Sequence, residues 1–261
     1  MSLVASGKIS ALFSLIAVCA AVLVMVRLAR RGRVPKIRRL AALDAIREAV
    51  GRAVEMGKPV HAVPGVGYLS SGADAAQTVA GLSVLDYTAS LCAKYGARLI
   101  STNQNPEVLP VQEQIVQQAY MAEGKSAAYR PEMVRHLSPA NMSYAAGAAG
   151  IIEREEVAAN IFVGSHGMEA LIMLEAGSRS GAIQIGGTAT LTRSMDFAVG
   201  TDFLLIGEDI FAAGAYLSNE PAQLASIAAQ DCCKIAILAL AIIGVVLAVF
   251  GNRTLTTILR T

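Results

Sequence analysis

Three histidines are the side chains in this sequence best suited to hold a metal ion or move a proton: His61, His136 and His166. Each falls in or beside a predicted strand, and Glu208 and Asp209 could add carboxylate ligands. No HxH or HxxxH spacing supports a metal site, and lone histidines are usually core or rim residues. We therefore expect no metal ion, and the sequence implies no cofactor.

A nucleophilic serine needs a base within reach, and Ser165 beside His166 is the one pair that invites this interpretation. The GxSxG turn of hydrolases is absent around it. Neighbouring residues of a strand point to opposite faces, so the two side chains are not expected to touch. No catalytic residue follows from the sequence, and enzyme activity is left open.

Glycines and small polar residues follow the predicted strands. The stretch PGVGYLSSGADAAQT, from Pro64 to Thr78, leads into a helix whose free N–H groups could hold an anion. Its spacing is GxGxxxxG, which differs from the dinucleotide fingerprint, and no GK[ST] follows. In open parallel sheets, ligands bind beyond the carboxyl ends of the strands. A polar or anionic ligand, such as a nucleotide, would there meet Gly65, Gly67, Ser101, Asn103, His166, Thr188 and Glu208. The alternative is that these residues only cap helices and close turns.

Six short apolar segments alternate mostly with helical patterns between residues 37 and 231. They predict strands over 59–64, 97–101, 132–137, 158–164, 182–186 and 201–206. Apolar strands without alternation are buried on both faces, which is typical of a mainly parallel sheet covered by helices. Right-handed crossovers then favour a doubly wound, Rossmann-like α/β domain. Helices are predicted over 38–57, 74–96, 110–124, 141–156, 168–178 and 208–231.

Two apolar runs flank this domain, residues 9–26 and 235–250. The whole chain is 54% apolar and 16% charged, whereas soluble domains are about 25% charged. At about 1.5 Å per residue the runs cover roughly 27 Å and roughly 24 Å, close to one hydrocarbon core each. We predict two transmembrane helices. The alternatives are a cleaved signal peptide for the first run and a buried core helix for the second.

Basic residues follow the first run and predict its orientation. We assign a membrane-surface role to Arg27, Arg30, Arg31, Arg33, Lys36, Arg38, Arg39 and Lys234. Positive charges resist translocation, so the basic side stays in the cytoplasm. The predicted divisions are an outer N-terminus 1–8, a span 9–26, a basic segment 27–39, a cytoplasmic domain 40–234, a span 235–250 and an outer tail 251–261.

The distribution of charge indicates the kind of partner, and the cysteines indicate the redox state of the compartment. Net charge is +2 with the basic residues crowded near the N-terminus, which favours an anionic bilayer surface and not nucleic acid. Cys232 and Cys233 are adjacent and form no zinc motif, so reduced thiols are expected.

Three long stretches resemble a known protein family. They are RRLAALDAIREAVGRAVEMGKPVHAVPG, AAQTVAGLSVLDYTA with YGARLI, and GTDFLLIGEDIFAAGAYLSNEPAQLASIAAQD, which together cover most of residues 37–231. The chain is similar there to an uncharacterised prokaryotic, membrane-anchored family catalogued as a domain of unknown function. The resemblance implies membrane attachment and brings no catalytic residue with it.

These features predict a membrane-anchored scaffold or assembly subunit of a homo-oligomer or of a larger membrane complex. The sequence AAGAAG, Ala145 to Gly150, offers a face of small residues for such assembly. The alternative is a ligand-binding or enzymatic domain that uses the strand-end crevice. A channel or transporter is disfavoured because neither apolar run contains an ionisable residue.

Overall fold

The computed structural model describes residues 9–31, 40–218 and 221–249. The chain divides into two compact units, one of which is the α/β domain Arg38–Ser218. The other contains helices α1 (Ile9–Arg30) and α9 (Pro221–Val249). The predicted segments 1–8 and 251–261 lie outside the described residues, as do Arg33, Lys36, Arg38 and Arg39.

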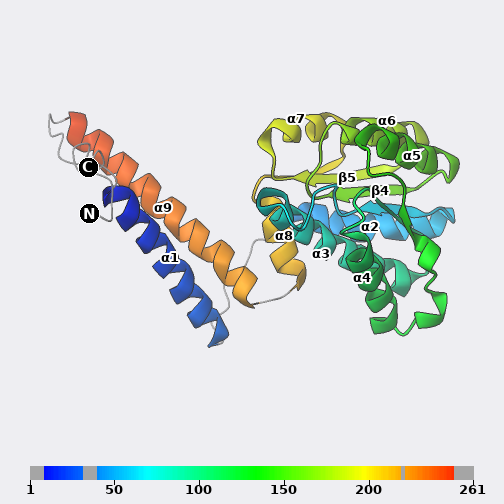
Figure 1. The fold of residues 1–261 in the computed structure, drawn as a ribbon, viewed down its shortest axis with the longest axis horizontal. Coiled ribbons are helices and arrows are strands. Elements are labelled where there is room, and N and C mark those ends of the chain that lie inside the picture. Colours follow the sequence, from blue (N-terminus) through cyan, green and yellow to red (C-terminus); the bar gives the residue numbers. More distant parts are fainter. Residues whose placement is uncertain (1–8, 32–39, 219–220, 250–261) are drawn as a thin grey trace. The chain divides into compact units, whose positions relative to one another are not determined.

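A six-stranded, entirely parallel sheet forms the centre of the α/β domain (Figure 1). Its strands are β1 (Val60–Val63), β2 (Leu99–Asn103), β3 (Val134–His136), β4 (Ala159–Val163), β5 (Ile183–Thr188) and β6 (Phe203–Ile206). Their spatial order is β3-β2-β1-β4-β5-β6. This confirms the predicted parallel α/β sheet, and the order is that of a doubly wound, Rossmann-type fold.

Helices cover both faces of this sheet (Figure 1). On one face lie α2 (Ala41–Met56), α3 (Gly72–Tyr95), α4 (Leu109–Ala122) and α8 (Asp209–Ser218). On the other lie α5 (Asn141–Arg154), α6 (Glu169–Ser180) and α7 (Leu191–Gly200). Every residue of β1, β2 and β4 is buried, which explains why these strands show no apolar–polar alternation.

Side chains alternate between the two cores along each strand. Ile161 joins the core under α2, α3 and α4, and the next residue, Phe162, joins the core under α5, α6 and α7. Phe162 packs against Phe197 of α7 with ring centroids 5.3 Å apart. The sheet therefore separates two apolar layers, and polar side chains lie near the ends of its strands.

The structure differs from the predicted elements in several places, for example at β3, which is shorter than the predicted strand 132–137. Helix α7 was not predicted, because its sequence LTRSMDFAVG presents a single buried residue, Phe197. Strand β2 extends to Asn103, two residues beyond the predicted end at 101. The α/β unit ends at Ser218 and not at 234, since a new helix begins at Pro221, a residue favoured in the first turn of a helix.

The second unit is a pair of helices that lie side by side and run in opposite directions (Figure 1). Among the described residues one helix, α9, is long and apolar enough over Pro221–Leu247 to cross a membrane, and its apolar window is not buried. Helix α9 runs without a break through Asp231 and Lys234, whose side chains are paired at 3.4 Å.

Candidate functional site

The switch in strand order lies between β1 and β4 at the centre of the sheet. From β1 the chain crosses to β2 on one side, and from β4 it crosses to β5 on the other. Doubly wound proteins bind ligands in the crevice at such a point, beyond the carboxyl ends of the two strands. The candidate site predicted from the sequence is therefore this crevice.

The loops that follow β1 and β4 pack directly against each other there. The Val66 N–H donates to the carbonyl of Ser165 over 2.8 Å. A Cβ on Gly65 would lie 2.7 Å from the main-chain N of Ser165, and one on Gly164 would lie 2.3 Å from the carbonyl O of Pro64. Both glycines also adopt positive φ, at 96° and 149°, so only glycine fits. The two loops meet main chain to main chain and so close the base of the crevice.

The N-terminus of α3 carries a carboxylate of the protein in its first turn. The Ser165 hydroxyl donates to Asp74 Oδ1 over 2.8 Å. A Cβ on Gly67 would approach both Asp74 and the Thr78 hydroxyl within 3 Å. A helix N-terminus attracts anions, and Asp74 already places a negative charge in the first turn of α3. A ligand phosphate would be repelled at this helix, which disfavours the predicted nucleotide.

Thr188, at the end of β5, is also tied to α3. The Gln77 side-chain oxygen accepts a hydrogen bond from the Ala189 N–H at 2.9 Å and lies 3.4 Å from the Thr188 hydroxyl. From β2, the Asn105 amide reaches the Gly67 carbonyl at 3.4 Å. The chain that follows β4 and β5 is thus fastened to the first two turns of α3, and the chain that follows β2 is fastened to the loop before that helix.

Ser101 and Asn103 do not reach the crevice. They lie inside β2 and face α4, where the Gln112 side chain contacts both: it donates to Ser101 Oγ and accepts from the Asn103 amide at 2.6 Å. All three side chains are buried. Glu208 lies at the exposed turn between β6 and α8, where its carbonyl accepts from the Phe211 N–H at 3.0 Å.

His166 points away from its neighbour Ser165, into the core beneath α7. Its ring lies 5.5 Å from the ring of Phe197, and its Nδ1 lies 3.6 Å from Oε1 of Glu169. Burial alone would raise the pKa of Glu169, but His166 and the Gly167 N–H together lower that pKa. Within the described residues, neither ring nitrogen of His166 has a hydrogen-bond partner. The Ser165–His166 pair therefore forms no nucleophile and base.

A second histidine, His61, belongs to a buried chain of hydrogen bonds under α5 and α6. Its Nδ1 donates to Asn160 Oδ1 at 2.7 Å, and its Nε2 lies 2.9 Å from the Thr102 hydroxyl. Thr102 in turn contacts the Tyr144 hydroxyl at 3.0 Å, and Asn160 contacts Gln184 at 3.3 Å. Burial lowers the pKa of His61 to about 4, so the ring is neutral at physiological pH.

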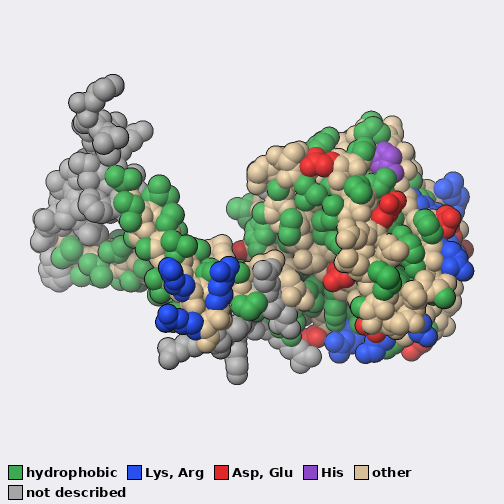
Figure 2. Space-filling model, turned by 60° about the horizontal axis from the view of Figure 1, so that its bottom comes forward, with side chains coloured by type: hydrophobic (Ala, Val, Ile, Leu, Met, Phe, Trp, Pro, Cys, Tyr) green, Lys and Arg blue, Asp and Glu red, His purple; other side chains and the backbone are tan. Residues whose placement is uncertain are grey.

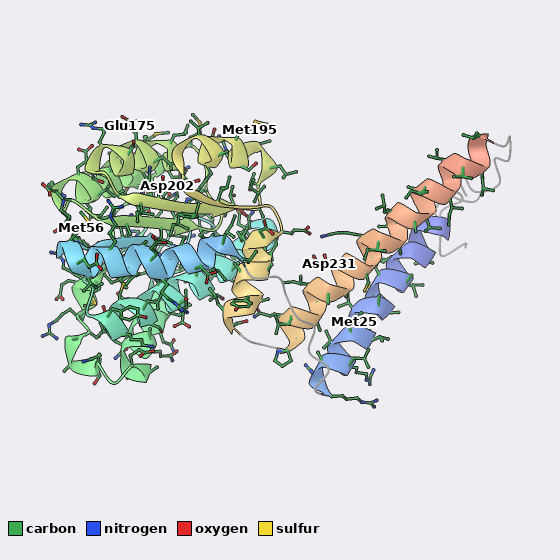
Figure 3. All side chains as sticks on the ribbon, turned by 180° about the vertical axis from the view of Figure 1, so that it is seen from behind. Met25, Met56, Glu175, Met195, Asp202 and Asp231 are labelled. Carbon is green, nitrogen blue, oxygen red and sulfur yellow. The ribbon has the colours of Figure 1, made fainter. Side chains whose placement is uncertain are left out.

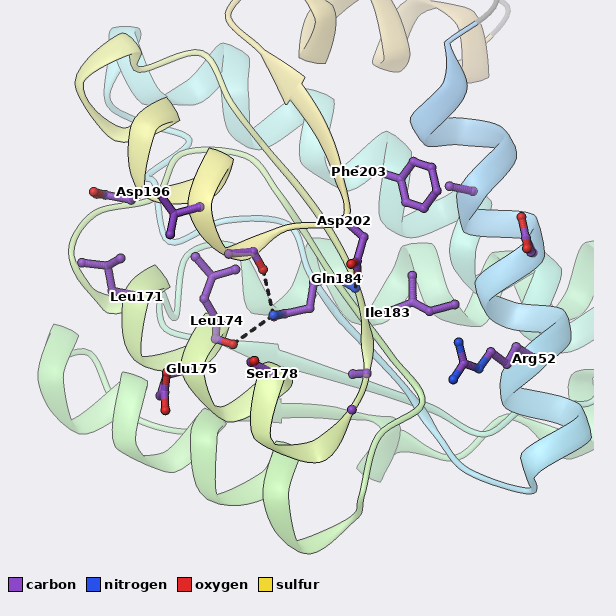
Figure 4. A pocket seen from close by; sticks show the side chains of 16 residues that line it. Arg52, Leu171, Leu174, Glu175, Ser178, Ile183, Gln184, Asp196, Asp202 and Phe203 are labelled. Atoms are coloured by element: carbon purple, nitrogen blue, oxygen red, sulfur yellow. Dashed lines mark hydrogen bonds between the residues drawn. The ribbon is translucent and has the colours of Figure 1, made fainter.

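A groove opens at the opposite, amino end of β5 and β6 (Figure 4). Its volume is about 840 Å³, and α2, α6 and α7 contribute to its walls. Its charged lining residues are Glu48, Arg52, Glu175, Asp196 and Asp202. Four of these five are acidic, so the groove favours cations. Sequence reasoning missed this groove because its residues come from three separate segments, 45–52, 171–184 and 196–203, with no shared motif.

In the part of the chain that the structure describes, no group of three or more His, Cys, Asp or Glu side chains is placed to hold a metal ion. Sequence reasoning also missed Asp74, Gln77 and Gln112, which hold the strand ends in place. Their signal was present, since each is a polar residue within the first two turns of a helix that follows a strand.

Fold and site together define a doubly wound α/β protein whose switch-point crevice is closed by its own loops. The chain belongs to the family described as a domain of unknown function, DUF6754, whose model matches residues 1–259. This confirms the resemblance to an uncharacterised family, while its prokaryotic origin and membrane anchor remain predictions. Searches of curated proteins and of solved structures found no match.

Proposed function

We propose that this chain is a membrane-anchored subunit whose α/β domain lies in the cytoplasm and acts as a scaffold or assembly component. It would assemble with itself or with other subunits of a membrane complex, and its remaining partner is the lipid bilayer. The observation that supports a scaffold is the closed crevice. Gly65 and Gly164 leave no room for even a Cβ atom beside the main chain of Ser165 and Pro64, at the place where related folds bind a ligand.

The membrane anchor in this proposal consists of α1 and α9. The part of α9 from residue 235 to residue 246 is apolar, and its large side chains are exposed, which is costly in water and favourable in lipid. Arg27 and Arg30 lie in the last turn of α1 and are exposed. Lys and Arg side chains gather on this unit beside hydrophobic surface (Figure 2). Basic residues at one end of a span favour the cytoplasmic side.

Cysteine labelling tests the orientation. In a chain with Cys19, Cys232 and Cys233 replaced by serine, Ser126→Cys adds an exposed thiol on the α/β domain. A membrane-impermeant maleimide should leave it unlabelled in intact cells and label it after lysis. A matched chain with Ser2→Cys should react in intact cells. Labelling of the Ser126→Cys chain in intact cells would contradict the cytoplasmic placement.

A thermal-shift screen tests the scaffold role against nucleotide binding. A ligand that binds only the folded state raises the melting temperature. We expect no shift of the full chain in mild detergent with nucleotides or anionic metabolites. A shift that Asp74→Asn enlarges would show an anion at the α3 N-terminus and would contradict the closed crevice.

The groove at the amino ends of β5 and β6 favours a second candidate, a binding site for a cationic ligand. Glu48 and Glu175 line it from α2 and α6, and both are exposed. The same screen with polyamines and basic peptides tests this role. A shift that Glu48→Gln and Glu175→Gln reduce would support a ligand-binding function, and no shift would exclude it for these ligands.

A further inference from the structure

The outer edge of the sheet at β6 is apolar and partly exposed. The strand reads Phe-Leu-Leu-Ile, and Phe203 is 37% and Ile206 44% exposed. No residue of the strand carries a charge. Soluble proteins protect such edges with charges, prolines or bulges, because a free strand edge recruits another strand.

The opposite edge of the same sheet is protected. Strand β3 is three residues long and contains Arg135 and His136, and Arg135 lies 3.7 Å from Glu155. This difference is expected if the charged β3 edge faces solvent and the uncharged β6 edge pairs with another strand.

The backbone of β6 presents hydrogen-bonding groups outward. Gly207 N–H donates to the Thr188 carbonyl of β5 at 2.9 Å. Because main-chain groups alternate in direction along a strand, Phe203 and Leu205 face β5 in the same way. Leu204 and Ile206 then direct their N–H and C=O groups away from the sheet. Two residues of one strand whose donors and acceptors point outward fit a second, antiparallel strand.

We propose that this edge joins two copies of the chain, with β6 of one copy pairing antiparallel with β6 of the other. A two-fold axis at Leu205 would place Leu204 opposite Ile206 of the partner subunit and satisfy the outward groups of both. The inference rests on the proposed assembly role and names its surface. The pairing is isologous, so one apolar edge supplies both sides of the contact.

The places where the chain leaves the domain agree with this pairing. Helix α2, the first element of the domain, and helix α8, the last, cover the same face of the sheet and both contact β6. The two-fold axis of an antiparallel strand pair is perpendicular to the sheet. It therefore keeps α2 and α8 of both copies, the elements of the domain next to the anchor segments in the sequence, on one side of the joined sheet. Confinement in one bilayer also raises their effective concentration.

The small-residue face predicted to mediate assembly is a weaker candidate. Ala145 and Ala148 are fully buried within their own subunit, and Gly147 lies against Leu137. Ala146 is the exposed member of the AAGAAG stretch. This stretch serves mainly the internal packing of α5.

Crosslinking at the edge tests the proposal. In the chain with Cys19, Cys232 and Cys233 replaced by serine, Leu204→Cys places a half-buried thiol on β6, and its partner's thiol lies within about 8 Å. A short bismaleimide should convert most of this chain in membranes to a covalent dimer. Arg135→Cys, on the opposite edge, should give several-fold less. Equal crosslinking of the two variants, or none at Leu204→Cys, would overturn the proposal.

A charge on the edge gives a second measurement. Ile206→Lys should shift the full chain in mild detergent toward the monomer, because two like charges would meet at the joined edge. Met195→Lys, on the outer face of α7 (Figure 3), is the matched control and should leave the oligomer intact. If the oligomer persists in Ile206→Lys and Leu204→Cys gives no crosslink, the β6 contact is wrong but the proposed assembly role is not. A monomer in every variant and in the wild type would instead remove the proposed assembly role.

Discussion

His61 and Asn160 face each other across the junction of β1 and β4, with 2.7 Å between imidazole Nδ1 and amide Oδ1. The two residues are fully buried at the point where the two halves of the sheet meet. Thr102 and Gln184 extend the contact to the neighbouring strands. A satisfied polar chain in a core fixes which strands pair, because any other arrangement leaves buried groups without partners.

Acid should unfold the domain through His61. Burial lowers the pKa of this imidazole to about 4, whereas an unfolded chain titrates near about 6.5. The unfolded state therefore binds a proton first as the pH falls, and stability present above pH ~6.5 is lost toward pH ~4, by about 3 kcal/mol. Urea unfolding between these values should show the loss. His61→Gln should flatten the profile, and His136→Gln, on the exposed end of β3, should leave it unchanged.

Gly164→Ala should destabilise the domain strongly. The new Cβ would lie 2.3 Å from the Pro64 carbonyl oxygen, at a φ of 149°, so both sterics and backbone strain oppose it. We expect a loss of about 3 kcal/mol in the free energy of unfolding. Gly51→Ala is the control: its Cβ meets nothing within 4 Å in the middle of α2. That change should stabilise by about 0.5–1 kcal/mol. Similar melting temperatures for both variants would contradict the closed crevice.

Ser165→Ala should cost about 1–2 kcal/mol, because it removes the hydroxyl that donates to Asp74. Ser83→Ala, whose exposed hydroxyl bonds only to the Val79 carbonyl of its own helix, should cost less. If the two variants lose the same free energy of unfolding in denaturant titrations, the Ser165–Asp74 hydrogen bond does not stabilise the domain more than an exposed one does.

A charge in the middle of α9 should weaken membrane insertion. Leu240→Arg places a guanidinium on an exposed, apolar part of the helix, at a cost of roughly 3 kcal/mol at the centre of a bilayer. The fraction of the chain that resists alkaline carbonate extraction should fall. Gln223→Arg, near the start of the same helix, should behave as wild type. If both variants extract equally, α9 does not cross the hydrocarbon core.

The sheet could be predicted from the sequence because its strands are short apolar runs bounded by glycines and polar turns. Their order could not be, since residues 60 and 159 pair only through the tertiary fold. Helix α7 was not predicted because it buries one side chain, Phe197, and so its sequence shows almost no helical periodicity of apolar residues.

Ligand binding by the predicted site residues stays a prediction, but the structure shows contacts of these residues that the sequence did not reveal. Ser101 and Asn103 looked like residues at the open end of a strand, yet Gln112 hydrogen-bonds to both of them inside the sheet. Gly67 suggested an open glycine turn, but a Cβ there would lie 2.8 Å from both Ser165 Cβ and Thr78 Oγ1. Such close approaches depend on which loops meet, and a sequence does not show that.

Native mass spectrometry of the full chain, released from membranes in mild detergent, tests the scaffold account most directly. The account predicts a species of two or more copies of the 27.2 kDa chain, with no added mass from a bound small molecule. A single copy that carries a stoichiometric small ligand would contradict it.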